Sequence, residues 1–119
     1  MNWYLSKIIF RIICGDGNHA PQFDEQLRLL CASDNEQAFD KALSIGQQEA
    51  QHFSNQQGKL VEWKFIGVAE LYRISELIDG AELFSRVQET DCADTYIQMV
   101  QRRAAFIRDS NTLRHLQLL

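Results

Sequence analysis

Two stretches near the start of the chain alternate between apolar and polar side chains, and this alternation constrains the fold more than any other feature. Residues 3–14 are rich in β-branched and aromatic types, and their even positions are more apolar than their odd ones. From residue 23 to residue 32 the pattern reverses, and the apolar side chains at odd positions are Phe23, Leu27, Leu29 and Cys31. The segment 15–21 between them is a loop by composition. We predict an antiparallel pair of strands whose second strand turns its odd face to the core and its even face to water.

The segment after these strands has the pattern of a helix. Ser33 and Glu36 have the spacing of a capping box, and apolar residues recur at helical spacing over about residues 34–53. Gly46 lies on the apolar side of this helix, where glycine costs about 1 kcal/mol relative to alanine. We expect a close approach between helix and sheet to compensate for that cost.

Residues 59–74 form the longest apolar stretch and predict a third strand. The apolar positions are odd before Gly67 and even after it, which a regular strand cannot achieve, so we expect a bulge or bend near this glycine. Asp79-Gly80 predicts a hairpin turn into a last strand at about residues 82–88. A two-residue turn there would place Arg73 opposite Arg86, which is a mildly repulsive pair.

These elements predict an α+β fold. We expect a four-stranded, mainly antiparallel sheet with the order ββαββα along the chain and helices packed on one face. The 119 residues fit a single domain over residues 1–119, with a C-terminal helix and a leucine-rich tail at about 91–119.

Charge and cysteine usage narrow the functional classes. Residues 1–90 carry 13 acidic and 8 basic side chains, giving −5, and residues 91–119 carry 3 and 4, giving +1. An acidic main body repels phosphate, so nucleic acid is not an expected partner. Three cysteines without CxxC spacing indicate reduced thiols and a cytoplasmic location. The apolar start is interrupted by Lys7 and Arg11, so no membrane association is expected.

Several segments resemble a known family. They are the opening Trp3-Tyr4, the predicted helix ending in Glu49 and His52, the stretch from Leu60 to Val68, and Glu82-Leu83-Phe84-Ser85-Arg86. Over about residues 3–88 the chain resembles the bacterial domain of unknown function 4288. The resemblance implies a small bacterial domain and carries over no catalytic residue and no cofactor.

One spacing is compatible with a metal or ligand site. Glu49 and His52 are three residues apart and would share a face of the predicted helix, and Glu62 follows shortly after the turn. Glu-x-x-His occurs in carboxylate-bridged metal sites, but those draw further carboxylates from other helices. We therefore interpret the three as surface or helix-end residues and assign no metal and no catalytic residue. A site with His52 as acid, base or ligand, oriented by Glu49 or Glu62, is the alternative.

Other candidate features have simpler interpretations. Gly15-x-Gly17 joins two strands, whereas a phosphate loop opens a helix, so we interpret it as a turn. Cys14 and Cys31 fall on predicted inward faces and Cys92 near the start of the second helix, where the helix dipole could lower its pKa. We interpret all three as structural.

The missing catalytic constellation, the acidic body and the apolar tail favour a non-catalytic protein-binding domain. An immunity-type inhibitor of a basic partner protein is the form we consider first, and self-association is the other. The interface would include leucines of the tail, namely Leu113, Leu116, Leu118 and Leu119. The alternative is a small enzyme or metal- or ligand-binding protein that uses Glu49, His52 and Glu62.

Overall fold

The computed structural model describes the backbone of residues 1–54 and 58–118 and the side chains of residues 1–51 and 58–110. The chain divides into two compact units, Met1–Ser85 and Arg86–Leu119, and each is described by itself. The single domain predicted over residues 1–119 therefore stays a prediction. No helix in the described part of the chain is long and apolar enough to cross a membrane. The elements are β1 Asn2–Cys14, β2 Gln22–Ala32, α1 Asn35–Glu49, β3 Gln51–Ser54, β4 Leu60–Ile74 and α2 Ala93–Leu118.

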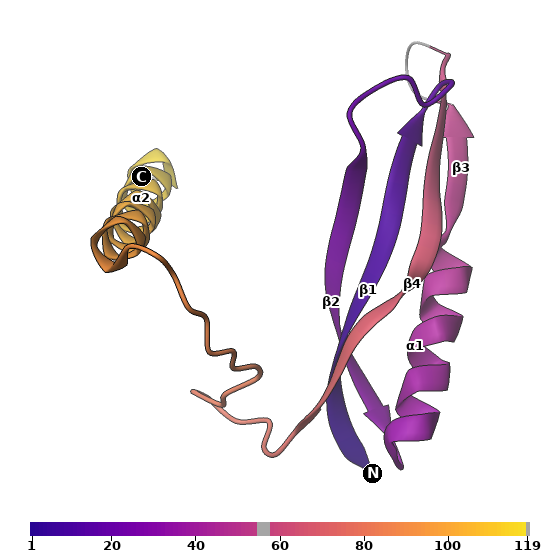
Figure 1. Cartoon of the computed structure of the whole chain (residues 1–119), viewed down its shortest axis with the longest axis horizontal. Coiled ribbons are helices and arrows are strands. Elements are labelled where there is room, and N and C mark those ends of the chain that lie inside the picture. The colour runs from indigo at the N-terminus through magenta and orange to yellow at the C-terminus, as the bar shows by residue number, and fades with distance from the viewer. Residues whose placement is uncertain (55–57, 119) are drawn as a thin grey trace. The chain divides into compact units, whose positions relative to one another are not determined.

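The first unit is an antiparallel sheet with the spatial order β2-β1-β4-β3, and α1 runs along one face of it (Figure 1). Three strands are long and β3 has only four residues. The α+β class and the antiparallel sheet are confirmed. In β1 and β2, Asn2 pairs with Ala32 and Ile12 with Gln22, so the predicted hairpin of residues 3–14 and 23–32 is confirmed as well.

The face of β2 that meets the helix was predicted wrongly. The even face of β1 is buried as expected, with Tyr4, Ile8 and Phe10 almost fully inaccessible. Cross-strand partners share a face of a sheet, and Phe10 pairs with Asp24, so the even positions of β2 also face α1. Phe23, Leu27 and Leu29, at odd positions, face the opposite way and are exposed. We call this side of the sheet, opposite α1, the outer face.

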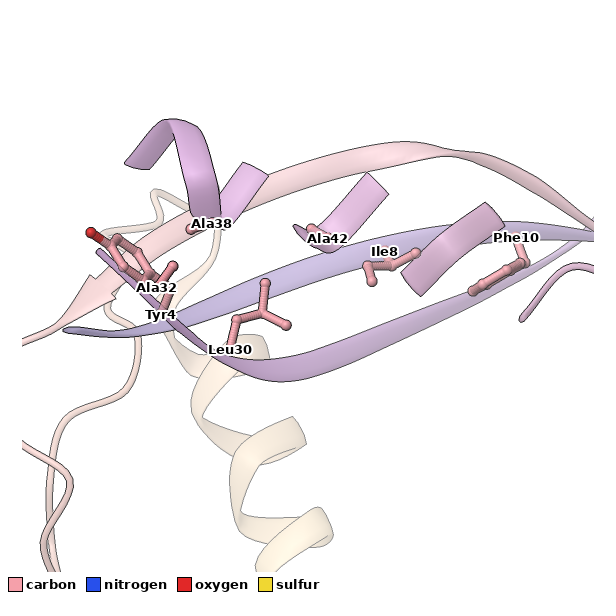
Figure 2. Packing of buried hydrophobic residues seen from close by; sticks show 7 residues of the cluster. All are labelled: Tyr4, Ile8, Phe10, Leu30, Ala32, Ala38 and Ala42. Atoms are coloured by element: carbon pink, nitrogen blue, oxygen red, sulfur yellow. The ribbon is translucent and has the colours of Figure 1, made fainter. Parts of the chain in front are cut away.

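Small side chains let α1 lie close to the sheet. Ala38 and Ala42 are fully buried, and Figure 2 shows them above the side chains of β1 and β2, among them Tyr4, Ile8 and Leu30. At Gly46 the expected close approach is confirmed, because a Cβ atom there would overlap the ring of Phe65 on β4.

The helix is capped one residue later than predicted. The Asp34 carboxylate accepts from the Gln37 N–H at 2.8 Å, and Gln37 Oε1 accepts from the Ser33 N–H at 2.5 Å.

The predicted irregularity near Gly67 is confirmed and is double. The first shift lies between Lys7 and Ile8, which pair with Glu70 and Val68. The second lies between Ile9 and Phe10, which pair with Gly67 and Phe65. The two residues of β4 left over are Ala69 and Ile66. They rotate the strand so that Phe65, Val68 and Leu71 all pack on the same core despite their mixed parity.

The last strand was predicted wrongly. Residues 82–88 form no strand, and the ββαββα order holds only because β3 forms from a segment assigned to the first helix. The Asp79-Gly80 turn does form, with Gly80 at φ +83° and Ala81 N donating to Ile78 O at 3.0 Å. However, β4 ends at Ile74, so no strand enters the turn. The turn forms because it depends only on its own residues. Strand pairing on either side of it would have placed Arg73 opposite Arg86, which is unfavourable.

The first helix is shorter than predicted. It ends at Glu49, and Ala50 already has extended dihedral angles, φ −60° and ψ 131°. The chain then passes directly into β3, which pairs with β4 from Leu60 to Trp63.

In the second unit α2 is continuous from Ala93 to Leu118, so the predicted tail is part of this helix. α1 packs against the sheet, and α2 belongs to the other compact unit.

The contact between Gly46 and Phe65 predicts the effect of one substitution. Gly46→Ala should destabilise the protein, because overpacking costs about 1–3 kcal/mol and the better helix propensity of alanine offsets only about 1 kcal/mol. Urea unfolding measures the difference. Ser44→Ala, at an exposed position of α1, is the matched control. Combining Gly46→Ala with Phe65→Leu should recover part of the loss, and a Gly46→Ala protein as stable as the wild type would contradict the packing described.

Candidate functional site

A ladder of polar side chains follows β2 on the face that carries α1. Asp24, Gln26 and Arg28 alternate with exposed residues along β2, so all three point to the same side. Gln26 connects the other two. Its Nε2 donates to Asp24 Oδ2 at 2.7 Å, and its Oε1 accepts from Arg28 Nε at 3.1 Å and Nη2 at 2.7 Å. Gln26 therefore holds an acidic and a basic side chain at a fixed spacing along the strand.

Two neighbouring elements complete this ladder. The Glu49 carboxylate, at the last residue of α1, forms an ion pair with Arg28 Nη2. The indole Nε1 of Trp63 donates to Asp24 Oδ2 at 3.1 Å. Both carboxylates thus accept from donors inside the cluster. This arrangement orders the side chains and gives neither carboxylate a nucleophile to activate.

An open hollow of about 330 Å³ lies beside the ladder. Its walls combine two aromatic rings with carboxylates and amides, contributed by Phe10, Asp24, Gln26, Glu49, Gln51 and Trp63. The hollow therefore offers both apolar contacts and hydrogen-bonding groups, as many recognition surfaces do. Among the described residues there is no group of three or more His, Cys, Asp and Glu side chains placed to hold a metal ion.

The three residues of the predicted ligand site lie on three elements, and only two of them are neighbours in the backbone register. Glu49 ends α1 and reaches Arg28, whereas His52 lies in β3, so the shared helix face was predicted wrongly. In the backbone register His52 is opposite Glu62. Glu62 follows Val61 and precedes Trp63, so alternation along β4 puts it on the other face from the hollow that Glu49 lines. The side chain of His52 is outside the described residues.

The outer face of the sheet is the second candidate surface. Its apolar side chains on β2 are Phe23, Leu27 and Leu29, which are 53%, 61% and 47% exposed. Its charges are balanced locally, since Lys7 Nζ lies 3.7 Å from Glu25 and 3.4 Å from Glu70.

Part of this outer face is covered by the chain that follows β4. The Phe84 ring packs on Tyr72 with 4.9 Å between ring centroids. A hollow of about 140 Å³ remains between this ring and the strands, lined also by Leu5, Lys7, Leu27 and Glu70. Within Met1–Ser85, the apolar side chains of β2 beyond this hollow remain exposed.

The loop between β1 and β2 contains a histidine that sequence reasoning missed. His19 Nε2 accepts a hydrogen bond from the Cys14 N–H at 3.0 Å, and Nδ1 lies 2.9 Å from the Ala20 carbonyl oxygen. The first bond requires an unprotonated Nε2, so Nδ1 carries the proton and donates to Ala20. Gly15 and Gly17 have positive φ angles, and the loop joins two strands as predicted. His19 thus closes a turn, and the only advance signal was its place in a glycine-rich loop.

The comparison with known proteins agrees with the boundary of the first unit. A family described as "Domain of unknown function (DUF4288)" matches residues 3–85. The chain belongs to this family. The resemblance expected from the sequence is confirmed, and the DUF4288 match ends where the first compact unit ends, at Ser85. No curated protein and no solved structure matches the chain.

Helix α2 and the cysteine before it lie outside the DUF4288 match. Cys92 is exposed, and its carbonyl oxygen accepts from the Tyr96 N–H at 3.3 Å, so it caps α2. Cys14 and Cys31 are half-buried and lie near opposite ends of the β1–β2 hairpin. Cys31 pairs with Trp3 on the odd face of β1, so its inward face was predicted wrongly. In α2, the side chains of Leu113, Leu116 and Leu118, and Leu119 beyond it, are outside the described residues.

The surroundings of Cys92 favour its thiolate. The Thr95 hydroxyl donates to Sγ at 3.2 Å and lowers the pKa of the Cys92 thiol, with smaller contributions from the backbone N–H groups of Thr95 and Asp94. Because the thiolate is the nucleophilic form, Cys92 should react first with iodoacetamide among the three cysteines.

Mass spectrometry after brief alkylation at neutral pH measures this order. Thr95→Val removes the hydroxyl donor while keeping the size of the side chain. It should slow modification of Cys92 and leave Cys14 and Cys31 unchanged. Equal rates for Cys92 in both proteins would contradict the role given to Thr95.

Proposed function

We propose that this protein is a non-catalytic protein-binding domain and that the outer face of its sheet is the contact surface. The observation that supports this proposal is the exposed apolar stripe of Phe23, Leu27 and Leu29 on β2. A folded domain gains no stability from large apolar side chains in water, whereas an interface gains about 25 cal/mol for each Å² of apolar surface it buries.

The hydrogen-bonded state of the polar cluster supports a binding role over a catalytic one. Asp24 and Glu49 are the carboxylates of the hollow, and each is already engaged by Trp63, Gln26 or Arg28. Catalytic acids and bases need a free position toward a reacting atom. The cluster is thus an ordered polar surface on the face that carries α1, and it leaves the outer face as the candidate contact surface.

The distribution of charge supports a basic protein as the partner. Residues 1–85 carry 12 acidic and 7 basic side chains, giving −5. The excess is carried by α1, with Glu36, Asp40 and Glu49 against Lys41, and by the segment after β4, with Glu76, Asp79 and Glu82. This excess of negative charge raises the association rate with a basic protein, and the effect weakens as salt rises. An immunity-type inhibitor that neutralises a basic toxin is the function we assign to this combination.

The proposal predicts a selective loss of binding from the outer face. The protein carrying Leu27→Thr and Leu29→Thr should fold normally, because both positions are exposed and threonine suits a strand. In an affinity capture from the native host, the wild type should retain a basic protein, and retention should weaken as salt rises. The double variant should lose that protein.

Phe39→Gln is the control for this experiment. Phe39 lies on α1, on the other side of the sheet, and the substitution also removes an exposed apolar side chain. The control should retain the partner. If the double variant captures the same protein as the wild type, or the wild type retains no basic protein, the assignment of the outer face is wrong.

A further inference from the structure

The free edge of β2 is the longest regular strand edge in the described part of the sheet. β2 stands at the end of the order β2-β1-β4-β3 and pairs with β1 alone. Its register with β1 runs from Gln22 to Ala32 without a shift. The N–H and C=O groups directed away from β1 are therefore aligned to accept another strand.

The other edges are protected by short length or by bulges, and β2 has neither. At the opposite end of the sheet β3 is only four residues long, and β4 carries two irregularities near Gly67. Short strands and bulges are common means of preventing edge-to-edge pairing, as are proline and lysine. β2 contains neither proline nor lysine, and Pro21 precedes it.

We propose that the edge of β2 pairs antiparallel with the same edge of a second copy of this chain, about a two-fold axis through Gln26. This inference does not depend on the proposed function. Strand pairing uses the backbone edge, and the side chains of the outer face stand perpendicular to it and remain accessible.

The charges along β2 select this register. A two-fold axis perpendicular to the sheet keeps α1 on the same face in both copies and brings each residue opposite its mirror position along β2. An axis through Asp24, Glu25 or Arg28 would place two like charges directly opposite each other, which is destabilising. An axis through Leu27 would place Asp24 opposite Leu30 of the second copy.

An axis through Gln26 is the register that matches opposite charges. It places Asp24 opposite Arg28 of the second copy, and by symmetry this pair forms twice. On the outer face it places Phe23 opposite Leu29 of the second copy. Gln26 already holds Asp24 and Arg28 within one copy through bonds of 2.7 Å, so the two charges are positioned before association.

Charge reversals in the full-length protein test this register. Sedimentation velocity over a concentration series should show a dimer for the wild type. Asp24→Lys turns both opposite-charge pairs into like-charge pairs and should raise the dissociation constant at least about tenfold. Asp40→Lys, the same reversal on the exposed side of α1, is the matched control and should leave the dimer intact.

A mixing experiment separates a lost interaction from a damaged fold. The second variant carries Arg28→Glu together with Glu49→Gln, which removes the carboxylate that would otherwise face the new one. Each variant alone should be monomeric, with circular dichroism and melting that show a folded chain. Mixed in equal amounts they should form a heterodimer, because Lys and Glu then meet at one pair and Asp and Arg at the other.

Three outcomes would overturn the inference. The first is a wild type that stays monomeric at every concentration. The second is a dimer whose dissociation constant is the same in the Asp24→Lys and Asp40→Lys proteins. The third is a pair of folded variants whose mixture stays monomeric. None of these outcomes affects the capture experiment with Leu27 and Leu29, because that experiment probes the outer face.

Discussion

The close contact between α1 and the sheet determines how the rest of the first unit is built. It depends on small residues, above all on Gly46, where the ring of Phe65 occupies the space of a side chain. The helix has 15 residues and is about 22 Å long, whereas the 13 residues of β1 extend over about 43 Å. α1 therefore covers only part of one face. Beyond the end of α1 at Glu49, the same face of the sheet is open to water and carries polar side chains. The polar ladder of β2 lies there.

The features predicted correctly from the sequence are those that depend on local chemistry or on a long periodic pattern. The two first strands, their antiparallel pairing and the buried even face of β1 follow from alternation over ten or more residues each. The irregularity near Gly67 was visible because a change of parity has few physical explanations. Gly46 was informative because a glycine inside a helix needs a compensating contact.

The errors share one cause, which is that sheet pairing depends on partners distant in sequence. Ala50 and Phe53 fit the helical period, and no glycine or proline marks the true end of α1, so pairing of β3 with β4 could not be foreseen. That error created the apparent Glu49 and His52 pair. On β2 the apolar residues suggested a buried face, but the register with β1 assigns the polar positions to the helix side. The polar ladder and the exposed apolar stripe were both hidden by that single reversal.

The short connection between α1 and β3 couples the helix to the far edge of the sheet. Only Ala50 separates the two elements, and its extended conformation gives the chain almost no slack. Any sliding or lifting of α1 must pull on the four residues of β3, and loss of those hydrogen bonds must release the end of the helix. The two elements should thus open and close as one cooperative segment, although one packs through side chains and the other through its backbone.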